Sequence, residues 1–229
     1  MTDLETDKGY GYLNKDVIEW LSNLHAKEND AHKDALSYLN NSNNTLEGLP
    51  AIQISPLDGR LIEILCRLSN AKNVVEFGTL SGYSALWILK ALPKDGHLWT
   101  VEFNPDHAKV ARSVFNKAGL SEKVTIVEMS GVDSLSHLSS SGPFDVIFLD
   151  ADKESYGVYA DWAVDNLRKA GLLLGDNALL FGELLDDIEN PNTINERVKG
   201  MRNFHKILSE KFVSTCLLTP EGLGVGLLK

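Results

Sequence analysis

The stretch Asn73–Ser84, NVVEFGTLSGYS, decides the fold of this chain. It opens with an apolar, β-branched run, turns through Gly78 and Gly82, and continues with helical spacing from Tyr83 to Leu92. The order is therefore strand, glycine-bearing loop, helix. Because glycine has no Cβ, such a loop exposes backbone N–H groups and a helix N-terminus to a polar ligand at the carboxyl end of a parallel strand. The stretch predicts the first unit of a nucleotide-type α/β fold, with Glu76 placed inside an otherwise apolar strand.

A second acidic residue narrows the ligand that this loop could hold. A dinucleotide fingerprint reads G-x-G-x-x-G, whereas this loop keeps only Gly78 and Gly82, which alone would indicate an ordinary turn. The next predicted strand, His97–Glu102, ends in a carboxylate twenty positions after Gly82, where an acidic residue takes the hydroxyls of a ribose. Together the two features predict an adenosine-containing cofactor. They leave both a nicotinamide dinucleotide and S-adenosylmethionine (SAM) open.

Composition sets the broad class. With 229 residues, 43% hydrophobic and 24% charged, the chain is long enough for one full α/β core. The formal net charge of −10 argues against a nucleic-acid-binding surface. The N-terminus lacks a signal-peptide pattern and no apolar run approaches the ~18 residues of a membrane span, so we expect no membrane partner and a cytoplasmic location. Cys66 and Cys216 show no metal or disulfide pattern, and we interpret them as buried reduced thiols.

Two short helices are predicted before the core, over Val17–Leu24 and Ala31–Leu39. The polar stretch Asn40–Gly48 then reads as a connector. We therefore divide the chain into an N-terminal helical segment, residues 1–48, that serves as a lid or a subunit contact, and a main domain, residues 49–229.

The main domain alternates strands with helices and ends in a hairpin. This order predicts a seven-stranded, mostly parallel sheet with helices on both faces and a C-terminal antiparallel hairpin. The expected strands are Val74–Phe77, His97–Glu102, Val124–Glu128, Phe144–Leu149, Leu172–Leu174, Phe212–Leu218 and Leu223–Leu228. The expected helices are Pro56–Leu68, Tyr83–Leu92, Pro105–Ala118, Val132–Leu138, Tyr156–Leu167 and Ile194–Leu208.

Acidic residues follow two neighbouring strands of this predicted sheet. Asp150 and Asp152 come directly after the fourth strand, and Asp176-Asn177 follow the fifth. The carboxyl ends of central strands line the ligand crevice of an open α/β sheet, so these groups should meet beside the Gly78–Gly82 loop. Either segment alone would indicate a helix cap, but together two carboxylates and an amide oxygen form a hard oxygen set suited to Mg²⁺.

Lys153, three residues after Asp150, is a candidate base. A partly desolvated lysine near a divalent cation can have a lowered pKa and accept a proton from a metal-bound hydroxyl, although alone it would be an ordinary solvated lysine. The six histidines are scattered without ligand or nucleophile spacing, and we interpret them as surface or helix residues.

These motifs resemble the cation-dependent O-methyltransferases, the group that includes catechol and caffeoyl-CoA O-methyltransferases and their bacterial relatives. The resemblance covers nearly everything from Ile52 to Lys229, through VVEFGTLSGYSALW, FDVIFLDADKESY, GLLLGDN and the closing hairpin, and residues 1 to about 50 match only loosely. It implies a Rossmann-like class I methyltransferase fold, SAM as cofactor, a divalent cation such as Mg²⁺, Ca²⁺ or Mn²⁺, and a homodimer.

The resemblance also implies roles for individual residues. Asp150, Asp176 and Asn177 correspond to metal ligands, Lys153 to the base, and Glu102 to the acid on the ribose. The positions that correspond to cofactor contacts are Ile54, Glu76, Gly78, Thr79, Ser84, Glu102, Val132, Asp150 and Asp152. Catalysis would then depend on Lys153 together with Asp150.

The expected reaction is methylation of a phenolic hydroxyl. The metal would bind both oxygens of a vicinal aromatic diol and lower the pKa of one, so that Lys153 removes an acidified proton before attack on the sulfonium methyl. Plant members of the family follow the Asp-Asn pair with a polar substrate contact, whereas this chain has Ala178–Phe181, and Phe181 predicts an apolar or aromatic wall. We therefore expect small catechols or caffeate-like phenolics rather than assuming a coenzyme A thioester.

Two other function classes share part of this pattern. A nicotinamide-dependent oxidoreductase would share the loop and Glu102 but should carry a third glycine and needs no pair of acidic strand ends. A non-catalytic SAM-binding module would keep the loop, but it has no use for the metal set together with Lys153.

Overall fold

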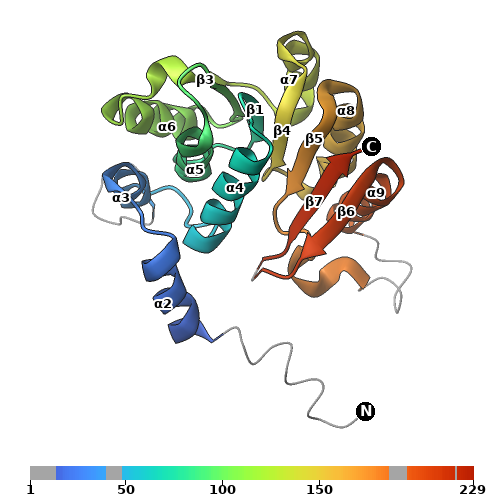
Figure 1. The fold of residues 1–229 in the computed structure, drawn as a ribbon, viewed down its shortest axis with the longest axis horizontal. Helices are drawn as coiled ribbons and strands as arrows, with labels where there is room; N and C mark the ends of the chain where they lie inside the picture. Colours follow the sequence, from blue (N-terminus) through green and yellow to red (C-terminus); the bar gives the residue numbers. More distant parts are fainter. Residues whose placement is uncertain (1–13, 40–47, 186–194, 220) are drawn as a thin grey trace.

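Seven strands in the order β3-β2-β1-β4-β5-β7-β6 form the centre of the computed structural model, which describes residues 14–39, 48–185, 195–219 and 221–229 (Figure 1). The first five strands are parallel, β7 runs antiparallel to β5, and β6 pairs antiparallel with β7. The predicted fold class is therefore confirmed. The strands are β1 (Asn73–Phe77), β2 (His97–Val101), β3 (Val124–Val127), β4 (Phe144–Leu149), β5 (Leu167–Gly175), β6 (Phe212–Leu217) and β7 (Leu223–Leu228).

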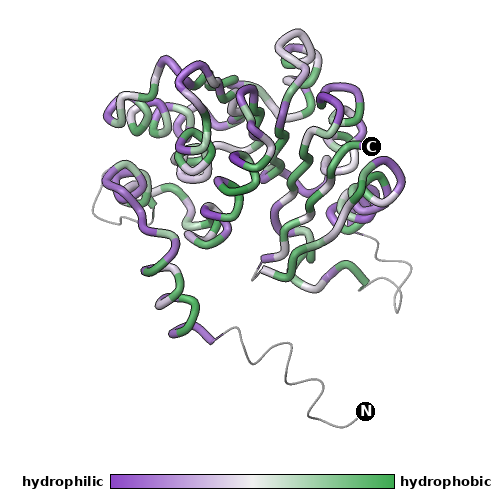
Figure 2. Tube along the Cα trace, in the orientation of Figure 1, coloured by the Kyte–Doolittle hydropathy of each residue, from purple (hydrophilic) through white to green (hydrophobic). Residues whose placement is uncertain are grey.

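Helices cover both faces of this sheet. Alternate residues of a strand point to opposite faces, so Val146 and Phe148 of β4 join one core with α4 and α5, while Ile147 and Leu149 join another with α8 and α9. Figure 2 shows the central strands as largely hydrophobic and the helices as mixed. The helices are α2 (Lys15–His25), α3 (Asp30–Ser37), α4 (Pro56–Leu68), α5 (Tyr83–Ala91), α6 (Pro105–Lys117), α7 (Gly131–Leu138), α8 (Tyr156–Asn166) and α9 (Glu196–Lys211), with short 3₁₀ turns η1 (Ser121–Lys123), η2 (Ser139–Ser141), η3 (Lys153–Ser155) and η4 (Leu180–Leu185).

The carboxyl ends of β1 and β4 lie side by side, because the strand order reverses between them. The Asp150 N–H donates to the Phe77 carbonyl at 2.8 Å, and the Asp176 N–H donates to the Leu149 carbonyl at 2.9 Å. Gly78 has φ +98°, and a Cβ there would overlap the backbone oxygen of Asp150. Only glycine allows this approach, and the tips of β4 and β5 meet beside the glycine loop as predicted.

The largest differences between observed and predicted element boundaries lie at β5 and α9. Strand β5 begins at Leu167, five residues before the predicted Leu172, and α8 ends one residue earlier than expected. The polar residue Arg168 stays in the strand because its guanidinium donates to Asp145 at 2.5 Å. Helix α9 runs to Lys211 rather than Leu208 and begins at Glu196, with Asn195 as N-cap; the predicted start at residue 194 lies outside the described residues.

The two N-terminal helices are present, and they differ in how they pack. On α3, His32 is fully buried against the Tyr83 and Trp87 rings of α5, with ring centroids 5.4 and 4.4 Å away. None of the 11 residues of α2 is buried, and the apolar side chain of Trp20 is 64% exposed. The predicted connector lies mostly outside the described residues. The role of the segment as lid or subunit contact stays a prediction.

Burial corrects one smaller interpretation. His32 lies on helix α3, in keeping with its interpretation as a surface or helix residue, and is buried in the core. Cys66 is buried, and burial raises the pKa of its thiol to about 12, whereas Cys216 is only half-buried because β6 is the edge strand of the sheet. None of the helices that the structure describes combines the length and apolar character needed to cross a membrane.

Candidate active site

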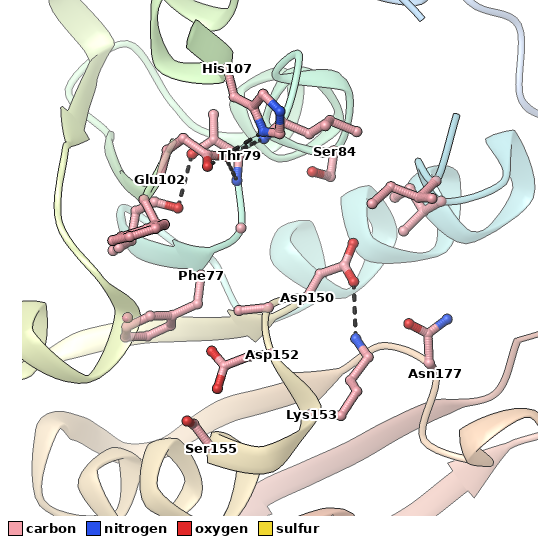
Figure 3. A pocket seen from close by; sticks show the side chains of 18 of the residues that line it. Phe77, Thr79, Ser84, Glu102, His107, Asp150, Asp152, Lys153, Ser155 and Asn177 are labelled. Atoms are coloured by element: carbon pink, nitrogen blue, oxygen red, sulfur yellow. Dashed lines mark hydrogen bonds and ion pairs between the residues drawn. The ribbon is translucent and has the colours of Figure 1, made fainter. Parts of the chain in front are cut away.

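A cavity of about 920 Å³ opens at the carboxyl ends of β1, β2, β4 and β5 (Figure 3). It is the place where the glycine loop and the acidic strand ends meet. Glu76 and Asp176 are buried and are not among its lining residues. The predicted site residues that line it are Ile54, Gly78, Thr79, Ser84, Glu102, Val132, Asp150, Asp152, Lys153 and Asn177.

Glu102 is tied to the glycine loop by backbone hydrogen bonds. Its Oε2 accepts the N–H groups of Leu80 at 2.8 Å and Thr79 at 3.3 Å, and its Oε1 accepts the Asn104 N–H at 2.9 Å. The His107 Nδ1 lies 3.6 Å from Oε1. The carboxylate therefore has a fixed place in the cavity wall, where it can take the hydroxyls of a ribose.

Glu76 lies directly behind this wall. The hydroxyls of Ser84 and Thr100 each donate to its carboxylate at 2.6 Å. Burial raises the pKa of Glu76 to about 8, and the two hydroxyls act in the opposite direction. Glu76 reaches the cavity through Ser84, which lines it, and the implied contact of Glu76 with SAM stays a prediction.

The other side of the cavity gathers negative charge with few partners. Burial, together with the charges of Asp150 and Glu221, raises the pKa of Asp176 to about 9. Burial also raises the pKa of Asp150, which the Lys153 ammonium opposes from 3.3 Å. These carboxyl groups lie close enough to repel one another, and one lysine is close enough to offset them.

This donor set fits a divalent cation. Carboxylates and an amide oxygen are hard ligands, and added positive charge would relieve the repulsion between Asp150 and Asp176. The described residues contain no group of three or more histidine, cysteine, aspartate or glutamate side chains placed to hold an ion. The predicted ligand set differs from such a group. It has only two carboxylates, those of Asp150 and Asp176, and its third ligand is the side-chain amide oxygen of Asn177.

Lys153 is held in place by a buried tyrosine. Its Nζ donates to the Tyr156 hydroxyl at 2.7 Å, and that hydroxyl lies 2.9 and 3.0 Å from the carbonyls of Leu149 and Asp176, which it can donate to. Tyr156 therefore links the lysine to the ends of both β4 and β5. Its position at the start of α8 looks like ordinary core in the sequence, so its contact with Lys153 was not predicted.

Other residues at the cavity also escaped the sequence analysis. The Tyr159 hydroxyl donates to Asp152 at 2.6 Å. Gln53 lines the cavity, and its Oε1 is buried without a hydrogen-bond partner among the described residues, which leaves an acceptor free for a ligand. Glu221 comes from the turn between β6 and β7. Single polar residues in a loop or turn carry no spacing signal, whereas His107 could have been found from its place five residues after Glu102.

Apolar side chains form the rim. Phe181, predicted as an apolar wall, lines the cavity and is 65% exposed. Ile52 and Phe103 also line it, and they are 70% and 77% exposed. Phe181 has φ +55°, a left-handed conformation that is uncommon for a bulky residue and turns the chain sharply after β5. The rim can contact the flat face of an aromatic ligand.

Comparisons with known proteins agree with this geometry. The profile of a family described as O-methyltransferase matches residues 26–228. A catechol O-methyltransferase of Niastella koreensis is 39% identical over 194 residues, 84% of each chain, and a catechol O-methyltransferase of Mycobacterium tuberculosis is 34% identical over 65% of this chain and 67% of its own. The crystal structure of an O-methyltransferase from Bacillus cereus in complex with SAH superimposes with a TM-score of 0.84 at 29% identity, covering 93% of this chain and 97% of that one.

Proposed function

Because this chain belongs to the O-methyltransferase family, and methyl transfer from SAM to oxygen follows from that membership, we propose that its acceptor is a vicinal aromatic diol and that the reaction needs a divalent cation. The observation that carries the proposal is that Asp150 and Asn177 line the cavity beside the cofactor loop, with Asp176 buried next to them and close enough for the Asp150 charge to raise its pKa. The family assignment contradicts both alternatives, the nicotinamide-dependent oxidoreductase and the non-catalytic binding module.

The cofactor belongs on the β1 and β2 side of the cavity. Glu102 would hold the ribose hydroxyls, and the backbone of Gly78 and Thr79 would approach the methionine part, where Ser84 begins α5. Phe103 and Val132, both exposed, would cover the adenine. This placement directs the sulfonium methyl toward Asp150 and Lys153.

The cation would be held by Asp150, Asp176 and Asn177. When bound there, a divalent cation supplies Lewis-acid polarisation of the acceptor hydroxyl. Lys153 lies beside this position, and it is the only lysine or arginine among the described residues that line the cavity. In its neutral form the Lys153 amine takes the proton of the attacking hydroxyl, and the ammonium that results can donate to Asp150 and Tyr156, as it does in this structure.

The remaining step is direct displacement at the methyl carbon. The acceptor oxygen forms a bond to carbon while the carbon–sulfur bond breaks, which leaves the sulfur neutral. Orientation of the two reactants in a near-attack geometry can supply roughly 7–11 kcal/mol of the barrier. The chain contributes by fixing both sites to neighbouring strand ends.

The acceptor is proposed to be a small catechol. The names of two relatives support this, and the exposed rings and alkyl groups of Phe181 and Ile52 would contact an aromatic ring. A caffeate-like phenolic would fit the same apolar rim. A homodimer is proposed from the family resemblance.

Labelled methyl transfer tests the proposal. The protein is treated with chelator, incubated with methyl-labelled SAM and a panel of catechol, caffeate, caffeoyl-CoA and monophenols, and then supplied with Mg²⁺, Mn²⁺ or Ca²⁺. We expect methylation of diols only, lost in chelator and restored by a divalent cation. Equal rates with monophenols, or full activity in excess chelator, would overturn the diol and the cation respectively.

A further inference from the structure

We propose that Glu221 is a positioning residue that turns the amide oxygen of Asn177 toward Asp150 and Asp176. The inference rests on the proposed function, since it concerns the residues that would hold the cation. Its basis is a contact between two segments far apart in the sequence, the end of β5 and the turn of the C-terminal hairpin.

The hydrogen bond between the two side chains has one polarity when Glu221 is ionised. The Asn177 Nδ2 donates to the Glu221 Oε2 at 3.1 Å. A carboxylate can only accept, so the amide must present its nitrogen to Glu221, and its oxygen then points the other way. Figure 3 shows that oxygen turned toward Lys153 and Asp150, with the nitrogen on the opposite side. An amide turned round would offer two N–H groups to the cation in place of an oxygen.

The backbone brings Glu221 to this place. Strands β5 and β7 pair with Gly175 opposite Gly224, which carries the hairpin turn alongside the residues after β5. The Ala178 N–H donates to the Gly222 carbonyl at 2.9 Å, and the Gly222 N–H closes the turn on the Thr219 carbonyl at 3.1 Å. A Cβ on Gly222, which has φ +78°, would overlap Leu179. The hairpin therefore holds Glu221 against Asn177.

The Asn177 segment is itself fixed from a third direction. His205 of α9 lies 2.7 Å from the Ala178 carbonyl through its Nε2. Asn177 has φ +52°, a left-handed conformation that asparagine tolerates better than most residues. Since the backbone is held, the amide retains rotation about its own side chain, and Glu221 removes that freedom. Partners that orient a metal ligand in this way typically change metal affinity or activity about 10- to 100-fold.

Binding of Mn²⁺ to the chelator-treated, SAH-loaded full-length protein tests the inference by calorimetry. We expect Glu221→Ala to weaken Mn²⁺ affinity about 10- to 100-fold with SAH affinity unchanged. Glu221→Gln should recover affinity to within roughly threefold, because its amide oxygen accepts the same N–H bond without the charge. In an Asn177→Ala background, Glu221→Ala should add nothing, since the amide it orients is gone.

Three results would overturn the inference. These are wild-type affinity in Glu221→Ala, equal losses in the alanine and glutamine variants, or additive losses with Asn177→Ala; the last two would mean that Glu221 acts through its charge. The exposed Glu122, on η1, supplies matched alanine and glutamine controls. If Glu221→Ala melts early, Glu221→Met fills the same space without accepting a hydrogen bond. Absence of Mn²⁺ binding in the wild type would instead contradict the cation in the proposed function.

Discussion

The two sides of the cavity differ in the hydrogen-bond partners and charged neighbours of their carboxylates. On the β1 and β2 side, Glu102 accepts three backbone N–H groups and Glu76 accepts two hydroxyls. On the β4 and β5 side, Asp176 has Asp150 and Glu221 as charged neighbours and its pKa is raised to about 9. The first side is complete before any ligand arrives, whereas the second is short of positive charge. This difference supports the proposed placement of the cofactor on one side and of the cation on the other.

Asp150→Ala should have the largest effect on turnover, because it removes a carboxylate from the β4 and β5 side and leaves the β1 and β2 side unchanged. We expect turnover to fall at least about 1000-fold, as loss of several kcal/mol of charge stabilisation requires. SAH affinity, measured by calorimetry, should stay within a few-fold. The exposed Asp165→Ala is a matched control. Turnover near the wild-type rate would remove the difference between the two sides.

Lys153→Met tests the base on the same side. Turnover should fall about 10²- to 10⁴-fold, since positioned proton transfer contributes that much. SAH and Mn²⁺ should still bind to this variant. Lys109→Met, at an exposed position, is the control. A less than tenfold loss of turnover would exclude Lys153 as base.

His32 tests whether the cofactor side depends on the N-terminal segment. Burial, helped by the charges of Lys90 and Arg60, lowers its pKa from 6.5 to about 4, and its Nδ1 contacts Asn29 at 2.6 Å. The unfolded chain therefore binds more protons between these values, so stability is complete above pH 6.5 and is lost as pH falls toward 4.

The loss should reach roughly 2–3 kcal/mol in the free energy of unfolding between pH 7 and pH 4.5. Urea denaturation across this range measures it, and His32→Gln should remove that part of the slope. Tyr83 directly follows the cofactor loop, packs against His32, and donates its hydroxyl to Glu28 at 2.5 Å. Protonation of His32 should therefore also disturb the cofactor loop, and we expect SAH affinity to weaken over the same pH range. The same pH slope in both proteins would contradict this account.

Glu102→Gln should have the smallest effect, a loss of SAH affinity that is confined to the β1 and β2 side of the cavity. Hydrogen bonds to a charged acceptor are worth about 1.5–3 kcal/mol, which corresponds to about 10- to 100-fold in SAH affinity. Mn²⁺ affinity should not change. If this variant lost Mn²⁺ binding and kept SAH binding, the assignment of the two sides would be reversed.

Local sequence patterns predicted the elements well where the chain alternates apolar runs with glycine. The order of β1, loop and α5 follows from such patterns, as does the pairing of the terminal hairpin. The beginning of β5 did not, because Arg168 and Lys169 are polar and Ala170 has φ +56°, so the strand's first half lacks an apolar run. Its place is decided by Asp145 and by pairing with β4, which are contacts across the fold.

The same limit applies to the site. Asp150 and Asp176 could be predicted, because a topological rule says where strand ends meet. Tyr156 and Glu221 could not, since one looks like core at a helix start and the other like a turn residue. Their roles depend on hydrogen bonds formed only after the hairpin and α8 pack against the ends of β4 and β5.

A crystal structure with SAH, Mg²⁺ and catechol tests the central claim most directly. The account predicts SAH on the Glu102 side, and one ion held by Asp150, Asp176 and the Asn177 oxygen, with a catechol hydroxyl near Lys153. An ion bound elsewhere, or a catechol seated with Asp150 and Lys153 still paired and no ion beside them, would contradict it.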